Sequence, residues 1–231
     1  TARSKGFEAE ATIAPAGGLT INASVGYTDA YYTSLLPQAI VNYVALLGWN
    51  PGDEREFFLM DDLIGAFDMD RINKANAAFS LEKLRWLNGE HIRSLSPEAF
   101  HKIALPYYPR ELAELDLEKI SQLIQVRTET MTDIPGLVGF LANLPEYSAE
   151  LFANQKSKST LETSRLVLEN ALPLLENLET WSNESLFELL KTFSQEQELK
   201  VGTVMWPIRT ALSGQETSPG GATELAALLG K

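Results

Sequence analysis

The spacing of apolar and polar residues changes near Leu35. Apolar and polar residues alternate over Gly6–Pro15 and again over Leu19–Ser34, and this period of two is typical of β-strands. Between them lies Pro15-Ala16-Gly17-Gly18, whose composition favours a tight turn. The pattern therefore predicts a β-hairpin over residues 1–35.

From Leu36 onward the apolar residues recur with the period of a helix. Pro37 suits a first helical turn, and Pro97 after Ser96 marks a second capped start. Pro173 is expected to kink or divide the helix that contains it. The fold class is therefore mainly α. The predicted helices are Pro37–Gly48, Asp61–Phe67, one after Ser80, one from Pro97, Leu117–Val126, Ile134–Ala142, Tyr147–Phe152, Thr160–Leu178, Ser185–Phe193 and Ala222–Leu229.

The helix after Ser80 combines an apolar face with several cations. Ser80 is expected to cap its N-terminus, because a serine oxygen can accept a backbone hydrogen bond there. The apolar side chains expected to face inward are Leu81, Leu84, Leu87 and Ile92. The polar face carries Lys83, Arg85 and Arg93.

Composition sets broad limits on function. The 231 residues are 45% hydrophobic, enough for one large domain or two to three small ones. The chain contains no cysteine, which excludes disulfides, thiolate catalysis and cysteine-ligated zinc. It has no run of 18 apolar residues, so no membrane-spanning helix is expected. The formal net charge of -12 argues mildly against general nucleic-acid binding.

The charge is distributed unevenly along the chain. Residues 71–110 contain seven Lys and Arg against three Glu, a net charge of +4, whereas residues 51–70 and 146–198 each carry -6. A locally basic surface could face phosphates while the acidic faces point to water. The alternative is that all these residues form ordinary solvated helix faces.

Sequence motifs for catalysis are absent. The chain has no Gly-rich nucleotide loop, no Gly-x-Ser-x-Gly and no His-Glu-x-x-His. Its two histidines, His91 and His101, are expected to be at the surface or partly packed. No catalytic residue and no metal ligand are predicted.

The tail offers a candidate binding site. Trp206-Pro207-Ile208-Arg209 is followed by Ser218-Pro219-Gly220-Gly221. An arginine can pair bidentately with a base edge or a phosphate, and Gly and Pro allow a flat ligand to approach the backbone. The alternative is that Trp206 is core, Arg209 pairs with a glutamate, and Ser218–Gly221 is only a turn into a helix. Arg127, at a helix end, has the same two interpretations.

Three ordered segments, Leu36–Asn73, Phe79–Arg93 and Lys200–Lys231, resemble the carboxy-terminal half of bacterial-type glutamyl-tRNA synthetases. The resemblance covers roughly residues 36–231. Residues 1–35 instead resemble a strand pair from a TonB-dependent outer-membrane receptor, with Tyr27, Tyr31 and Tyr32 as an aromatic girdle. We therefore expect a composite sequence with its junction near residues 34–36; the alternative is a diverged native hairpin.

The synthetase resemblance implies a domain order and a set of RNA contacts. Residues 36–93 would be a helical stem-contact region, 94–141 a first anticodon-binding domain and 142–231 a second. By resemblance, Arg127 reads the third anticodon base and Arg209 the first. The residues expected near the middle base are Ser218, Pro219 and Gly221, although the family has a bulkier apolar residue where Gly221 stands. Weaker contacts with the RNA backbone are expected from Lys74, Lys83, Arg85 and Arg93.

The resemblance also implies the role of the chain. In the whole synthetase, a Rossmann domain with two ATP motifs activates glutamate with ATP and magnesium; this chain has no counterpart of those motifs and no cofactor is expected in it. The expected partner is a glutamate-accepting tRNA, with no DNA or membrane contact, and the expected state is a cytoplasmic monomer. Two other hypotheses are a helical protein-interaction module and, from residues 1–35 alone, a receptor fragment.

Overall fold

The computed structural model describes residues 2–13, 21–32, 34–73 and 78–231. Contacts between Cα atoms divide the chain into two compact units. Unit 1 comprises Thr1–His91 with Glu129–Thr132, and unit 2 comprises Ile92–Thr128 with Asp133–Lys231. Each unit is described by itself below.

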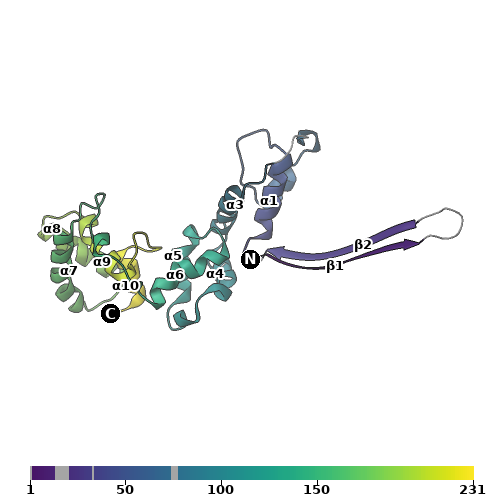
Figure 1. Ribbon diagram of the computed structural model, residues 1–231. Helices are drawn as coiled ribbons and strands as arrows, with labels where there is room; N and C mark the ends of the chain where they lie inside the picture. The colour runs from purple at the N-terminus through teal and green to yellow at the C-terminus, as the bar shows by residue number, and fades with distance from the viewer. Residues whose placement is uncertain (1, 14–20, 33, 74–77) are drawn as a thin grey trace. The chain divides into compact units, whose positions relative to one another are not determined.

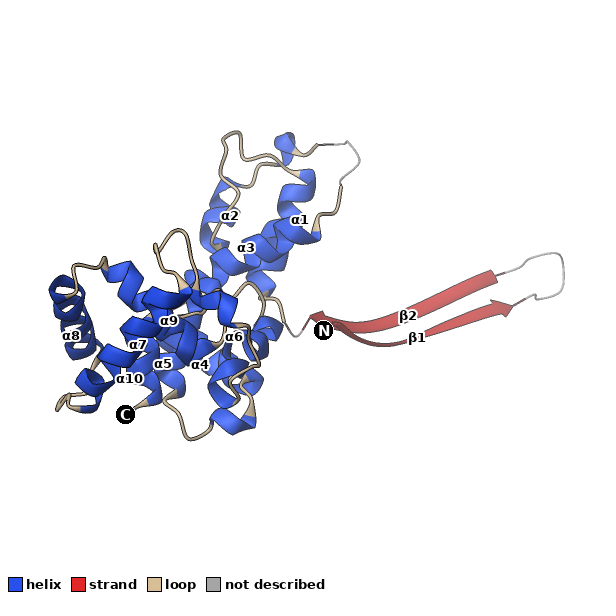
Figure 2. Ribbon diagram, turned by 60° about the vertical axis from the view of Figure 1, so that its left-hand side comes forward, coloured by secondary structure: helices blue, strands red, loops and turns tan. Residues whose placement is uncertain are grey.

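Ten α-helices, together with short 3-10 helices, hold more than half of the described residues (Figures 1 and 2). They confirm the mainly helical fold class and most of the predicted helices. Short 3-10 turns join several of them, including η4 (Gln125–Arg127) and η6 (Ala149–Phe152). The α-helices are α1 Pro37–Gly48, α2 Met60–Ala66, α3 Leu81–Arg93, α4 Pro97–Ala104, α5 Leu117–Ile124, α6 Ile134–Ala142, α7 Leu161–Glu176, α8 Asn183–Glu196, α9 Val201–Ser213 and α10 Ala222–Leu229.

Two strands precede the helices (Figure 2, red). β1 (Ala2–Ile13) pairs antiparallel with β2 (Ile21–Tyr32), so that Ala2 lies opposite Tyr32 and Ile13 opposite Ile21. The turn predicted at residues 15–18 lies outside the described residues. Among the helices that the structure describes, none has both the length and the apolar character needed to cross a lipid bilayer.

A buried amide organises the helical part of unit 1. Asn42, fully buried on α1, donates its Nδ2 hydrogen to the carbonyl of Glu56 at 3.0 Å and accepts the N–H of Phe58 at 2.9 Å. Its Oδ1 also lies 3.3 Å from Nε2 of His91. The amide therefore fixes the extended segment after α1. His91 is only 3% exposed, so its predicted place at the surface or in partial packing is wrong.

Helix α3 has the predicted buried face with one exception. Leu84, Leu87 and Ile92 are buried, and Ser80 Oγ accepts the N–H of Lys83 at 3.2 Å as the predicted cap. Leu81, predicted to face inward, is instead 59% exposed. It is the first residue of the helix, where it lines a surface hollow instead of packing against the core.

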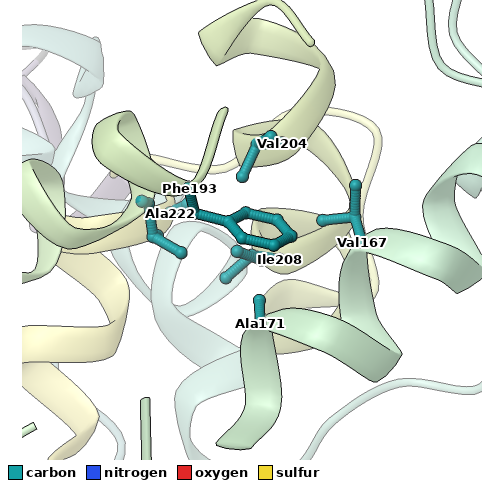
Figure 3. Close-up of a cluster of buried hydrophobic side chains, with 7 residues drawn as sticks. Val167, Ala171, Phe193, Val204, Ile208 and Ala222 are labelled. Atoms are coloured by element: carbon teal, nitrogen blue, oxygen red, sulfur yellow. The ribbon is translucent and has the colours of Figure 1, made fainter. Parts of the chain in front are cut away.

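Helix α9 is the centre of the carboxy-terminal half of unit 2, where it packs on α7, α8 and α10. The four helices share one apolar cluster, and the ring of Phe193 points into it toward Val167 (Figure 3). Its buried members are Val167, Ala171, Leu190, Phe193, Val204, Ile208 and Ala222. Burying a Val, Ile or Phe side chain contributes about 1.5–3 kcal/mol, so this cluster fixes α9 firmly.

Prolines and short segments account for the differences from the predicted helices. Helix α9 was not predicted, because Gly202 and Pro207 both disfavour a helix interior; Pro207 nevertheless lies buried inside it. Pro173 was predicted to kink or divide its helix; helix α7 runs through Pro173 and ends three residues later, so it is not divided there. The predicted helix Tyr147–Phe152 is the shorter 3-10 turn η6, in which Ser148 Oγ accepts the N–H of Glu150 at 3.2 Å as a cap.

Candidate nucleic-acid interface

Arg209 is held by contacts from its own helix and from the loop that follows α9. Its guanidinium carbon lies 4.4 Å from the centroid of the Trp206 ring. Its Nη1 donates to Ser218 Oγ at 3.1 Å and its Nη2 to the carbonyl of Glu216 at 2.7 Å. Among the described residues, Arg209 thus bonds to the backbone carbonyl of Glu216 and not to its carboxylate. Together these contacts give the guanidinium a defined position.

The loop between α9 and α10 is fixed at both ends. Gly214 ends α9 in a left-handed conformation (φ 62°), where a side chain would be strained. At the other end, Gly221 is the N-cap of α10 and its N–H donates to the Glu224 carboxylate at 2.7 Å. Inside the loop, Ser218 Oγ donates to the carbonyl of Gly220 at 2.8 Å. These contacts hold the loop in one defined conformation.

Arg127 is the last residue of η4, and side-chain hydrogen bonds from Gln125 and Thr128 anchor this turn. The side-chain amide of Gln125 donates to the carbonyls of Ile92 and Leu95, both at 2.9 Å. Thr128 Oγ1 donates to the carbonyl of Ile124 at 2.9 Å. The backbone under Arg127 is therefore fixed, while the arginine itself is exposed to solvent.

Arg127 and the loop after α9 line one surface pocket of about 410 Å³ within unit 2. Arg127, Ser218 and Pro219 are all among its lining residues. Arg209 stands next to this lining through its bonds to Ser218 and Glu216. Sequence reasoning did not identify the remaining lining residues, which are Gly136, Leu137, Gln215, Glu216 and Thr217.

Positive charge is concentrated at the pocket. Burial lowers the pKa of Arg209 from its ordinary value, the nearby Arg127 lowers it further, and Glu216 acts in the opposite direction. An arginine guanidinium carries a positive charge in proteins. Among the described residues that line the pocket, Glu216 is the one carboxylate. The arrangement suits a ligand rich in hydrogen-bond acceptors, such as a base edge or a phosphate.

Two residues predicted at this site have other contacts. Ser218 is only 3% exposed, and its hydroxyl both donates to Gly220 and accepts from Arg209. Gly221 is exposed but caps α10 and does not appear in the pocket lining.

The predicted backbone contacts of the basic stretch have protein partners. Lys83 forms an ion pair with Glu56, and Arg85 pairs with Glu129 at 3.1 Å. Arg93 donates to the carbonyl of Val126 at 3.3 Å, and Lys74 lies outside the described residues. Because exposed ion pairs contribute only about 0–1 kcal/mol, a phosphate could still compete for these side chains.

Comparison with known proteins assigns most of the chain to two family models. The model described as "Anticodon binding domain" matches residues 99–231. The model described as "tRNA synthetases class I (E and Q), catalytic domain" matches residues 22–86.

Relatives and solved structures agree with these matches. The glutamate–tRNA ligases of Clostridium tetani (strain Massachusetts / E88) and Clostridium novyi (strain NT) are 48% and 44% identical over 211 and 215 residues, 91% of this chain. The chain spans 43% and 44% of their lengths. A crystal structure of a glutamate tRNA ligase from Elizabethkingia meningosepticum, in complex with its amino acid, matches with a TM-score of 0.68 and 29% identity over 89% of this chain and 41% of that one. The glutamate-tRNA synthetase from Elizabethkingia anophelis matches with a TM-score of 0.66 and 30% identity over 89% of this chain and 40% of that one.

These matches correct the interpretation of residues 1–35. The synthetase catalytic-domain match begins at residue 22, inside β2, and continues through the expected junction to residue 86. The glutamate–tRNA ligases also align with 91% of the chain. A junction near residues 34–36 is therefore wrong, and the likeness to an outer-membrane receptor is not borne out.

Proposed function

The chain belongs to the anticodon binding domain family, and from this premise we propose that it recognises tRNA as the carboxy-terminal part of a glutamate–tRNA ligase. The observation that carries the proposal is that Arg127, Ser218 and Pro219 line one pocket, while Arg209 is bonded to Ser218 beside it. Arg127 and Arg209 lie 82 positions apart along the chain, so only the fold brings them together. An anticodon loop, with unstacked bases and phosphates, matches the charge and the donor groups of this pocket.

Each residue at the pocket has a separate role in contacting the anticodon. Arg127 pairs with the edge of the third anticodon base, and Arg209 with the first. Pro219, half-buried, offers an apolar surface to the middle base. Ser218 acts mainly through Arg209, because its buried hydroxyl is already engaged. Gly221, exposed at the N-cap of α10, is a further candidate contact for the middle base.

The rest of the chain has supporting tasks. We propose that residues 36–93 contact the tRNA stem and that residues 94–141 and 142–231 form two successive anticodon-binding domains. Lys74, Lys83, Arg85 and Arg93 are the candidate backbone contacts, each weak. The tRNA would be bound by a monomer in the cytoplasm.

The chemistry belongs to the whole ligase. There, ATP and magnesium support the formation of glutamyl adenylate, and glutamate is then transferred to the terminal ribose of the tRNA. The sequence of this chain contains no nucleotide-binding motif, so its own residues bind and select the tRNA.

One observation favours a second candidate, a helical protein-interaction module. The acidic partners of Lys83 and Arg85 come from distant parts of the chain, and the net charge is -12. A surface neutralised in this way would suit a protein partner better than a phosphate backbone.

Binding across a salt series separates the two candidates. The titration uses a transcript of glutamate tRNA and three proteins: the wild-type chain, Arg209→Ala and Arg165→Ala. Arg165 is the matched control, because it forms an exposed pair with Glu169 on α7. We expect affinity to fall with salt, Arg209→Ala to lose about 1–3 kcal/mol, and Arg165→Ala to bind like wild type. Absence of salt-dependent tRNA binding would favour the protein-interaction module.

A further inference from the structure

The aromatic ring under Arg209 has no role in the contacts proposed so far. We propose that Trp206 is a positioning residue, which holds the guanidinium of Arg209 in the one orientation that can read an anticodon base. This inference rests on the proposed tRNA recognition and assigns a new residue to it. Trp206 itself would touch no base.

The ring of Trp206 is fixed before any ligand arrives. Its indole N–H donates to the carbonyl of Leu151 at 2.8 Å, in the 3-10 turn η6. Trp206 and Arg209 are three residues apart on α9, a spacing that brings two side chains together on one helix face. The guanidinium carbon of Arg209 consequently lies 4.4 Å from the ring centroid, within the range of a cation–π interaction.

Two hydrogen bonds complete the support and set the rotation of the guanidinium. The Ser218 hydroxyl gives its hydrogen to Gly220, so an oxygen lone pair is available for Nη1 of Arg209. The Glu216 carbonyl accepts from Nη2. Of the five N–H groups of a guanidinium, these described contacts use two. The remaining three N–H groups stay available to a ligand. The Trp206 ring and the two hydrogen bonds to the loop together fix the plane in which they lie.

This support matters because base reading depends on direction. An unsupported arginine side chain must give up about 2 kcal/mol of rotamer freedom to bind in one geometry. The like charge of the nearby Arg127 also opposes that of Arg209, and the cation–π contact with the ring offsets part of this repulsion. A residue that holds Arg209 in place should therefore affect discrimination between anticodons more than it affects general RNA affinity.

The chain provides a matched control in Trp181. Its indole N–H also donates to a backbone carbonyl, that of Ala226, at 2.8 Å, and it is partly buried like Trp206. Among the described residues, no arginine or lysine lies over its ring in the way that Arg209 lies over Trp206. Trp206→Leu and Trp181→Leu thus remove comparable packing and the same kind of hydrogen bond, whereas only the first removes the support of Arg209.

The experiment compares wild type, Trp206→Leu, Trp206→Phe and Trp181→Leu by two readouts. The first is the ratio of affinities for glutamate tRNA transcripts with the native anticodon and with a changed first anticodon base. The second is the NMR position of the Arg209 side-chain resonances in the protein without RNA, since an aromatic ring shifts nuclei above its face.

We expect Trp206→Leu to reduce the affinity ratio about fivefold, from the usual strength of a cation–π contact, and to move the Arg209 resonances. Trp206→Phe should keep most of the ratio, and Trp181→Leu should leave ratio and resonances unchanged. Equal ratios for Trp206→Leu and Trp181→Leu, with wild type still selective, would overturn the positioning role. If wild type shows no selectivity at all, the proposed tRNA recognition fails, while a shift of the Arg209 resonances on Trp206→Leu still supports the contact itself.

Discussion

Gly214 connects the stability of unit 2 to the shape of the pocket loop. It has φ of 62° at the end of α9, directly before the loop that carries Ser218 and Pro219. A Cβ atom added there would lie 2.7 Å from Cδ1 of Tyr147 and 3.0 Å from Cγ of Pro145. Gly214→Ala therefore introduces backbone strain and a steric clash at once.

The size of the effect can be estimated from these two terms. A left-handed conformation costs a residue with a side chain about 1–2 kcal/mol, and overpacking costs about 1–3 kcal/mol. Because the added Cβ atom would lie closer to Tyr147 than side-chain atoms pack, both costs apply, and we expect a total loss of about 2–5 kcal/mol in the free energy of unfolding. The displaced loop should also weaken binding of glutamate tRNA.

Gly202→Ala is the matched control. Gly202 lies in the same helix without a positive φ, and a Cβ atom there would meet nothing within 4 Å. The substitution should stabilise α9 by about 0.5–1 kcal/mol. The assay is urea unfolding of both variants, with circular dichroism as the recorded signal. Equal stability of Gly214→Ala and Gly202→Ala would refute the reasoning about the conformation of this loop.

Three further predictions concern single groups and the chain as a whole. Ser96→Ala should destabilise unit 2 by about 1 kcal/mol, because Ser96 Oγ accepts the N–H of Ala99 at 3.2 Å; urea midpoints would measure it, and an unchanged midpoint would exclude the cap. Burial lowers the pKa of His91 below 6.5, so stability should fall as pH decreases from about 6.5 to the lowered pKa. His91→Gln should flatten this dependence in unfolding curves measured between pH 5 and pH 7.5, roughly the window in which histidines titrate, and an unaltered slope would contradict the assignment. The chain alone should support no glutamate-dependent exchange of pyrophosphate into ATP, since its sequence contains no nucleotide-binding motif; exchange above background would show that this inference is wrong.

The sequence was most informative where local signals agree. Helix α1 has the bounds that Pro37 and Gly48 predict, and α4 starts at the predicted serine cap with Pro97 in its first turn. The apolar period also predicted the buried face of α3, except at Leu81, where the helix has only begun. Local signals succeed in these cases because caps and periodic faces are decided within a few residues.

Long-range contacts could not be predicted in the same way. Pro207 and Gly202 obscured α9, and without that helix the three-residue spacing of Trp206 and Arg209 had no meaning. The ion pair of Arg85 joins residues 44 positions apart, and no local pattern signals such a partner. Family resemblance named Arg127 and Arg209, but only the fold shows that one pocket lies beside both.

The most direct test of anticodon reading is a binding matrix of protein variants against anticodon variants. Wild type, Arg127→Ala and Arg209→Ala are each titrated with glutamate tRNA transcripts that carry a single change at the first, middle or third anticodon base. The account predicts that wild type discriminates at these positions, that Arg209→Ala loses discrimination at the first base only, and that Arg127→Ala loses it at the third base only. Equal weakening of every transcript by both substitutions would contradict the account, because it would reduce both arginines to contacts with the RNA backbone.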